Sequence, residues 1–186
     1  AVSKLCRPNS TNSNGVAVDH EGSAYVTGST LSFEGSVPGG HFPVIVGPDL
    51  THNGVQSDAF VAKVNASGTA LDYCGYIGGS ASDFGYEIAV DLWGTAYVIG
   101  FTTSAEDTFP VIGGPDLTYN GDTDAFVAKV NASGTALEYC GYIGGSGLDY
   151  GFKIAVDGAR NAYVTGTTKS TEATFPVAGG PDLTHN

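Results

Sequence analysis

Apolar and polar residues alternate in short runs along most of the chain, and turns of small or polar residues separate the runs. In FVAKV at 126–130, for example, Phe, Ala and Val alternate with Val and Lys. A period of two is typical of β-strands, where every second side chain shares a face. Four such runs are expected at 88–91, 96–102, 125–130 and 136–143. Gly- or Asn-containing turns join the first to the second and the third to the fourth, which predicts two hairpins.

The same set of strands returns at a fixed interval. Residues 58–80 read DAFVAKVNASGTALDYCGYIGGS, and residues 124–146 repeat them with Glu138 in place of Asp72, which gives a period of 66 residues. An insertion at 33–40 lengthens the first unit. Four antiparallel strands per unit are typical of a β-propeller blade, whereas a coil of a β-solenoid is much shorter. The pattern therefore predicts an all-β fold of tandem propeller blades.

The repeat divides the single propeller-repeat region, 1–186, into four parts. We expect a partial blade at 1–14 that holds only a third strand, complete blades at 15–85 and 86–151, and a half blade at 152–186. Residues 1–5 (AVSKL) align with FVAKV at 60–64, and a polar segment between Cys6 and Asn14 replaces the fourth strand. A ring needs about four blades to close. We therefore expect an incomplete ring of two full blades plus partial blades, completed by further copies or by a longer polypeptide.

The order of these blocks resembles a known family. The units share blocks that follow one another in the same order, at constant spacing over almost the whole chain. In order, the blocks are IAVD, AYVTG, FP, DAFVAKVN, SG, AL, YIGGSG and DYG. They resemble the bacterial β-propeller repeat, abbreviated SBBP for seven-bladed β-propeller. The resemblance implies a propeller scaffold. Cys74 and Cys140 depart from the family pattern, in which a small residue such as Ser or Ala is common.

Composition and charge narrow the classes of partner. The chain has 28 glycines, no methionine and 14% charged residues, a balance that favours short strands joined by glycine turns. The formal charge of −12 would repel a phosphate backbone, which excludes nucleic acid, and it helps to keep a β-protein soluble. No apolar run is long enough to cross a bilayer. The chain begins at Ala1 without a Met, so we expect a processed protein that is extracellular or at the cell surface.

The long loops between second and third strands should share one face of the propeller with the connections between blades. Long loops on a rigid scaffold often carry binding sites. The candidate residues of this ligand face recur in each unit: Phe42, Phe109, Phe175, Asp49, Asp116 and Asp182. The competing interpretation, which their recurrence favours, is that the phenylalanines anchor the loops to the blade edge.

One spacing could suit a metal ion. Asn120, Asp122 and Asp124 place oxygen ligands at alternate positions, as Ca²⁺ sites do. The run lacks a downstream bidentate Glu, and the first unit does not repeat it. The four histidines show no metal-ligand spacing. We therefore expect an Asx-rich turn and no cofactor, with Ca²⁺ as the alternative.

Recurring aspartates could suggest catalysis, but a turn explains them. Asp19, Asp91 and Asp157 end the first strand of each unit, and Asp83 and Asp149 follow the GGS turns. Carboxylates that accept backbone N–H bonds account for both sets. The sequence contains no G-x-S-x-G elbow and no phosphate-binding glycine loop. We therefore expect no enzyme activity.

The cysteines and the glycosylation sequons add little to the prediction of function. We expect Cys74 and Cys140 to be small buried thiols, with Cys6 unpaired. The sequons at Asn9, Asn65 and Asn131 fit turn chemistry or, in a secreted protein, glycan attachment.

The expected function is a non-catalytic extracellular or cell-surface propeller module with a structural role or with protein or glycan as partner, within a larger assembly. The alternatives are a protomer that assembles with its own copies into a ring or filament by sharing blades, and a propeller-based hydrolase or lyase.

Overall fold

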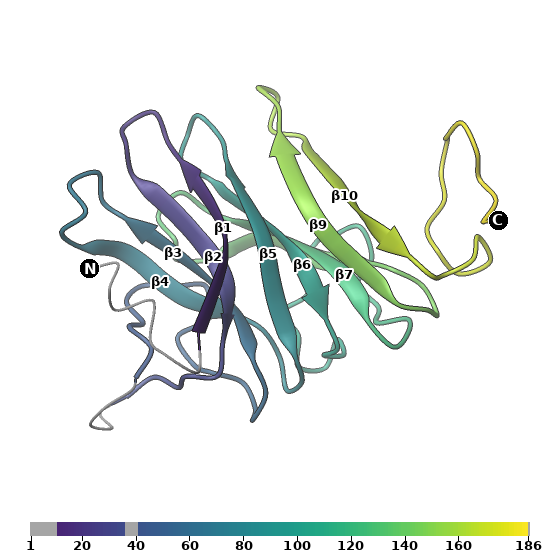
Figure 1. Ribbon diagram of the computed structural model, residues 1–186, viewed down its shortest axis with the longest axis horizontal. Coiled ribbons are helices and arrows are strands. Elements are labelled where there is room, and N and C mark those ends of the chain that lie inside the picture. The colour runs from purple at the N-terminus through teal and green to yellow at the C-terminus, as the bar shows by residue number, and fades with distance from the viewer. Residues whose placement is uncertain (1–10, 36–40, 186) are drawn as a thin grey trace.

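The protein is all-β. A computed structural model describes residues 11–35 and 41–185, and every regular element among them is a strand. The first sheet contains β1 (Thr11–Val18), β2 (Ala24–Thr30), β3 (Asp58–Val64) and β4 (Leu71–Ile77). The second contains β5 (Asp83–Val90), β6 (Ala96–Thr102), β7 (Asp124–Val130) and β8 (Leu137–Ile143). The third contains only β9 (Asp149–Val156) and β10 (Ala162–Thr168) (Figure 1).

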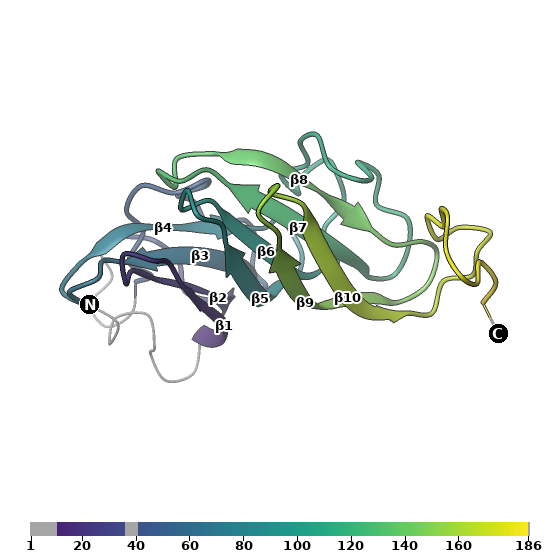
Figure 2. The same ribbon diagram turned by 90° about the horizontal axis from the view of Figure 1, so that it is seen from above.

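The sheets have the strand order of propeller blades. In each sheet the strands are antiparallel and follow the order of the chain. The first strands, β1, β5 and β9, lie next to one another along one side, and β4 and β8 lie on the opposite side (Figure 2). The structure thus confirms two complete blades and a half blade, and the sheets do not close into a ring. No helix that could cross a membrane occurs within the described ranges.

The inner strands begin earlier than the sequence predicted. β5 begins at Asp83, whereas we expected the first strand of this blade at 88–91, and β9 begins correspondingly at Asp149. A bulge explains the difference, because the register of β5 against β6 shifts between Gly85 and Glu87 and interrupts the alternation of side chains.

The N-terminal segment needs a similar correction. β1 begins at Thr11, so residues 11–14 belong to an inner strand and not to a polar replacement of a fourth strand. The predicted third strand at 1–5 lies outside the described residues.

The core lies mainly between the two complete blades. Val61, Tyr73 and Ile77 of the first blade are buried in one cluster with Ile88 and Phe126 of the second. A smaller cluster surrounds Phe60 under the first long loop. Because burial of apolar area is the main favourable contribution to folding, each blade stabilises the next by covering its face.

Candidate functional site: the loop face of the blades

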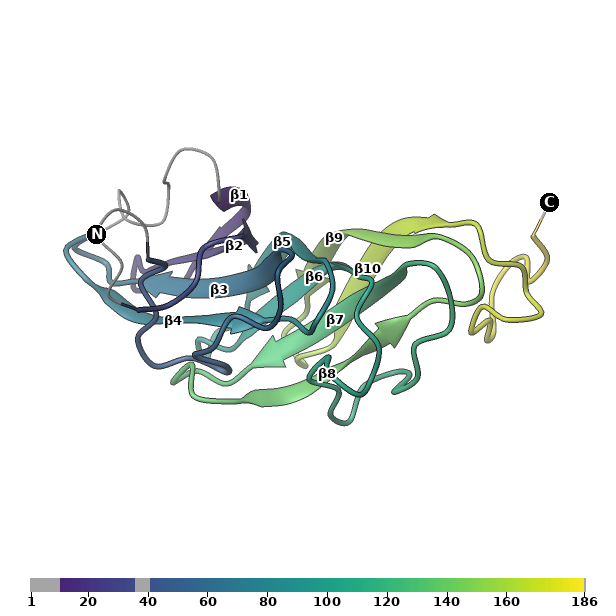
Figure 3. The same ribbon diagram turned by 90° about the horizontal axis from the view of Figure 1, so that it is seen from below.

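The long loops and the connections between blades do share one face. The N–H of Ser80 donates to Thr108 Oγ1 at 3.1 Å, and the N–H of Ala81 donates to Ser104 Oγ at 2.9 Å. The half blade repeats the first contact, because the N–H of Ser146 donates to Thr174 Oγ1 at 3.1 Å. After β10 the chain extends past the end of the two complete sheets (Figure 3).

The phenylalanines of the loops are anchors. Phe42 and Phe109 are each only 2% exposed, with ring centroids 5.1 Å from Phe60 and 5.3 Å from Phe126. A ligand cannot reach them, which agrees with the anchoring interpretation. Phe175 is only partly buried, since its sheet contains just β9 and β10 within the described residues.

The loops also cover the outer edges of the complete blades. The N–H groups of Ile45 and Ile112 donate to the carbonyls of Cys74 in β4 and Cys140 in β8, at 2.9 and 2.8 Å. A Cβ on Gly47 would lie 2.6 Å from the Cα of Gly75, so only glycine permits this close approach. Each complete blade therefore has its fourth strand hydrogen-bonded on both sides.

The loop aspartates hold their own turns. Asp49 Oδ1 accepts the N–H of Thr51 at 2.9 Å, and its Oδ2 accepts Asn53 Nδ2 at 2.7 Å. Asp116 binds Thr118 and Asn120 in the same way, and Asp182 Oδ1 accepts the N–H of Thr184. These carboxylates stabilise loop conformation, and a ligand would compete with those bonds.

The candidate metal ligands do not converge. The backbone N–H of Asn120 donates to Asp124 Oδ2 at 2.9 Å, while its side chain turns to Asp116 Oδ2 at 2.8 Å. Asp124 is buried and Asp122 is exposed. No three His, Cys, Asp or Glu side chains are arranged to hold a metal ion in the part of the chain that the structure describes. The segment is a turn that hydrogen bonds from Asn120 to Asp116 and Asp124 hold in place.

The aspartates that end the inner strands cap their turns, as predicted. Asp91 Oδ1 accepts the N–H groups of Trp93 and Thr95, both at 2.9 Å, and its Oδ2 accepts the Tyr97 hydroxyl at 3.1 Å. Burial opposes ionisation of Asp91, but these donors outweigh it and lower its pKa. Asp19 and Asp157 make the same set of bonds in the other two sheets.

Asp91 also binds a cation of the half blade. Arg160 Nε donates to Asp91 Oδ2 at 3.0 Å, Arg160 Nη2 donates to Thr95 Oγ1 at 2.9 Å, and the guanidinium lies 5.4 Å from the centroid of the Trp93 ring. Trp93 and Arg160 are not repeated in the other units, so the repeat pattern gave no signal for this contact.

Buried aspartates pair where the blades meet on the loop face. A Cβ on Gly78 would lie 2.7 Å from Asp58 Cγ and 2.9 Å from Asp83 Oδ2, so both carboxyl groups flank this glycine. Burial raises the pKa of Asp58 and of Asp83 to about 7. Asp124 and Asp149 occupy the same positions one blade later, and burial raises the pKa of Asp124 to about 6, with the charge of Asp149 adding to the effect.

The four carboxyl groups of this pairing are buried, and Asp149 also borders the cavity between β10 and the second blade. Asp83 Oδ2 accepts the N–H of Gly79 at 2.8 Å and the hydroxyl of Ser104 at 3.1 Å, and Asp149 caps Gly145 in the same way, as predicted for these two residues. Sequence reasoning missed the pairing itself. The sequence signal for the pairing was the aspartate that precedes Ala-Phe in both complete units, at Asp58 and Asp124.

The thiols and sequons are structural where they are described. Cys74 and Cys140 are free and buried, and burial raises the pKa of the Cys74 thiol to about 12. Asn65 Oδ1 accepts the N–H of Thr69 at 2.9 Å, and Asn131 does the same in the next blade. Cys6 and Asn9 lie outside the described residues.

Four-stranded antiparallel sheets whose first strands lie side by side are the blades of a β-propeller protein. The family profile described as a beta-propeller repeat (SBBP) matches residues 7–34 and 139–172. The second match begins in β8 and continues through β10. Two segments of the chain, one at each end of the described blades, therefore match the SBBP beta-propeller repeat. The search of curated proteins found no match.

Proposed function

We propose that the chain is a non-catalytic propeller module that serves as a structural or binding part of a larger assembly. One observation carries this proposal: the recurring aspartates are bound into the scaffold in the same way in successive blades. An active site needs a reactive group that faces a cleft and a partner that activates it. Here the carboxylates either cap turns or lie buried between blades.

Binding is the second part of the proposal, with protein or glycan as the partner class. The long loops lie on a rigid scaffold, which is where binding residues usually occur. They expose apolar side chains at equivalent places: Ile45 and Leu50 in the first blade, and Ile112 and Leu117 in the second. A periodic surface of this kind suits an extended or repetitive partner.

An extracellular or cell-surface location belongs to the same proposal. Its support is the acidic composition, with a formal charge of −12, which keeps a β-rich surface soluble. Labelling of intact producing cells with a membrane-impermeant amine reagent tests the location. Labelling only after lysis would contradict it.

The non-catalytic assignment is tested with Asp83→Asn and Asp149→Asn. We expect the unchanged chain and both variants to show no turnover of peptide, ester or glycoside substrates above buffer. Turnover by the unchanged chain that disappears in Asp149→Asn, with the melting temperature preserved, would overturn the proposal and favour a hydrolase. Asp72→Asn, an exposed position on β4, is the matched control for the loss of one carboxylate.

A further inference from the structure

The half blade ends on a strand whose outer neighbours are missing from the structure. β2 reads AYVTGST, β6 reads AYVIGFT and β10 reads AYVTGTT. β2 pairs with β3, and β6 pairs with β7, in one common register. Within the described ranges β10 pairs only with β9. Tyr163 of β10 is consequently 59% exposed, whereas Tyr25 and Tyr97 at the same position are fully buried.

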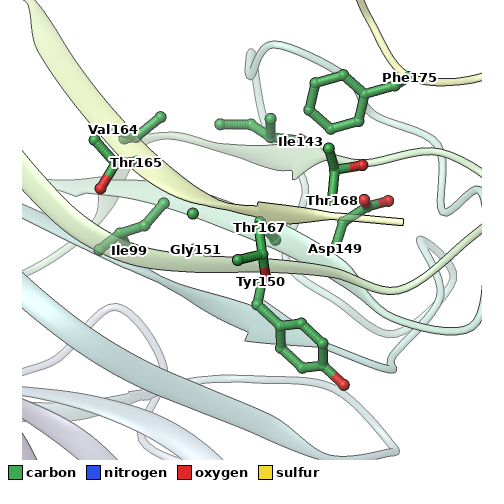
Figure 4. A pocket seen from close by; sticks show the side chains of 12 residues that line it. Ile99, Ile143, Asp149, Tyr150, Gly151, Val164, Thr165, Thr167, Thr168 and Phe175 are labelled. Atoms are coloured by element: carbon green, nitrogen blue, oxygen red, sulfur yellow. The ribbon is translucent and has the colours of Figure 1, made fainter. Parts of the chain in front are cut away.

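A cavity marks where one side chain of the missing strand belongs. It has a volume of about 150 Å³ and lies between β10 and the second blade (Figure 4). Its lining is mainly apolar and includes Ile99, Ala125, Ile143, Val164, Gly166 and Phe175, and Asp149 and Thr168 also border it. Figure 4 shows Ile143 near Phe175, with Val164 farther from Phe175. An apolar cavity of this size accepts a benzene-sized group.

The second blade shows what fills this position. There Phe126 stands opposite Gly100 in the β6–β7 ladder, and its ring packs 5.3 Å from Phe109. A Cβ on Gly100 would lie 2.9 Å from Phe126 Cε1, so the ring lies over the glycine. Gly166 and Phe175 are the counterparts of Gly100 and Phe109. The cavity therefore has the place and the size of a phenylalanine ring.

The charge pattern specifies a second residue. Lys63 stands opposite Tyr25, 3.5 Å from Asp19 Oδ2 and 4.9 Å from the centroid of the Tyr25 ring. In the second blade Lys129 lies opposite Tyr97, 5.2 Å from the centroid of its ring, and forms its ion pair with Glu138. The half blade repeats the acceptors, since the Tyr163 hydroxyl donates to Asp157 Oδ2 at 2.9 Å. The missing strand should carry a lysine opposite Tyr163.

The missing part extends beyond one strand. Tyr73 in the first blade is 1% exposed, because Gly134, in the turn between β7 and β8 of the next blade, lies against its ring. Tyr139 has the same position in the second blade but stays partly exposed, in a groove with Val127 and Ala162. A turn like the one at Gly134 would cover it. The missing element is therefore a hairpin.

We propose that β10 and the adjoining face of β7 and β8 dock a β-hairpin of the β7–β8 type that belongs to a further propeller repeat. Its first strand pairs antiparallel with β10, with a phenylalanine opposite Gly166 and a lysine opposite Tyr163. The inference rests on the proposed function and names the partner of the open edge. The strand at 1–5 of a second copy is a poorer occupant, because Ala1 aligns with the phenylalanine and would leave the cavity empty.

The experiment appends a copy of residues 121–143 directly after Asn186, which corresponds to Asn120 and so keeps the natural spacing. We expect amide hydrogen exchange in β10 to slow by at least about tenfold and the melting temperature to rise. The matched control is the same extension with its copy of Phe126 replaced by Ala, which should lose most of both effects. A copy with Lys129 replaced by Ala tests the second contact.

Three results would overturn the inference. They are no protection of β10 by the extension, equal protection with and without the phenylalanine, or dimerisation of the unextended chain that protects β10. If the extended chain misfolds, a separate peptide of residues 124–143 with Cys140→Ser can be added to the unextended chain instead. Protection of β10 from exchange should then saturate as the peptide concentration rises, and it should be lost when Phe126 of the peptide is replaced. The proposed function fails by a different readout, substrate turnover, which is independent of exchange in β10.

Discussion

At the scale of single residues, Asp91 shows how one carboxylate fixes a blade. It accepts bonds from two backbone N–H groups and a tyrosine hydroxyl, and it also binds Arg160 of the next sheet. Its counterpart Asp157 makes the same bonds within its turn but lies at the open end, where it is only partly buried. The two aspartates make the same hydrogen bonds within their turns but differ in burial and in the Arg160 contact, so comparing their variants isolates the effect of these two differences.

We expect Asp91→Asn to lower the free energy of unfolding by roughly 1–3 kcal/mol, because buried donors lose a charged acceptor and Arg160 loses its partner. Asp157→Asn should have a smaller effect, since water replaces the lost bonds. Urea unfolding followed by tyrosine fluorescence measures both. Equal effects at the two positions would show that burial and the Arg160 contact add nothing.

The buried aspartates set the pH dependence of stability. Burial raises the pKa of Asp58 from 3.8 to about 7, so the native state keeps a proton that the unfolded chain releases. This contribution is complete below about pH 4 and is lost as the pH rises through about 7. Asp91 acts in the opposite direction: its pKa is lowered, so its contribution is present above about pH 4 and is lost in acid.

We therefore expect the free energy of unfolding to decrease between about pH 4.5 and pH 7.5, and Asp58→Asn to reduce that decrease, because the neutral amide has no proton to lose. His52, whose Nε2 lies 4.0 Å from Asp58 Oδ1, stays unchanged in this variant. Denaturant unfolding at several pH values measures the slope. The slope should persist in the control Asp72→Asn, and an unchanged slope in Asp58→Asn would contradict the assignment.

At the scale of elements, the turn between the third and fourth strands does two things. Gly68 and Gly134 occupy the same place in identical NASG turns, with φ of 70° and 73°. A Cβ on Gly68 would meet open space, whereas one on Gly134 would lie 2.7 Å from Tyr73 Cβ. The second turn therefore also seals the contact between the blades.

Replacing each of these two glycines by alanine separates the effect on the turn from the effect on the contact between blades. Both variants should lose about 1–2 kcal/mol from the left-handed backbone, and Gly134→Ala should lose a further 1–3 kcal/mol or so, because the methyl group displaces Tyr73. Thermal unfolding measures the difference. If the two variants have the same stability, Gly134 does not pack against the first blade in solution.

The elements also show why sequence prediction succeeded and where it failed. The repeat located the second strand of every unit and the third and fourth strands of both complete blades closely, because alternation and glycine turns are local signals. It missed the first residues of β1, β5 and β9, since a bulge interrupts the alternation there. It also missed the pairing of Asp58 with Asp83, which lie on strands of different blades and are joined only by tertiary packing. The contact of Arg160 with Asp91 is hidden for the same reason.

At the scale of the whole molecule, the stability of each blade depends on what covers it. The second blade covers the first through a shared core, and β9 covers part of the second. Only β9 and β10 lack a following blade within the described residues. In repeat proteins, stability is the sum of the units and of their interfaces, so we expect local stability to be lowest at this end.

Hydrogen exchange tests this gradient with an internal control. β2 and β10 differ only by Ser29 in place of Thr167, so their intrinsic exchange rates are nearly equal. β2 is hydrogen-bonded on both sides, by β1 and β3, whereas β10 is bonded only by β9. We expect amides of β10 to exchange at least about tenfold faster than those of β2 in the unextended chain at low concentration. Similar protection of the two strands would mean that another chain already covers β10, and the open half blade would then not be the solution state of this protein.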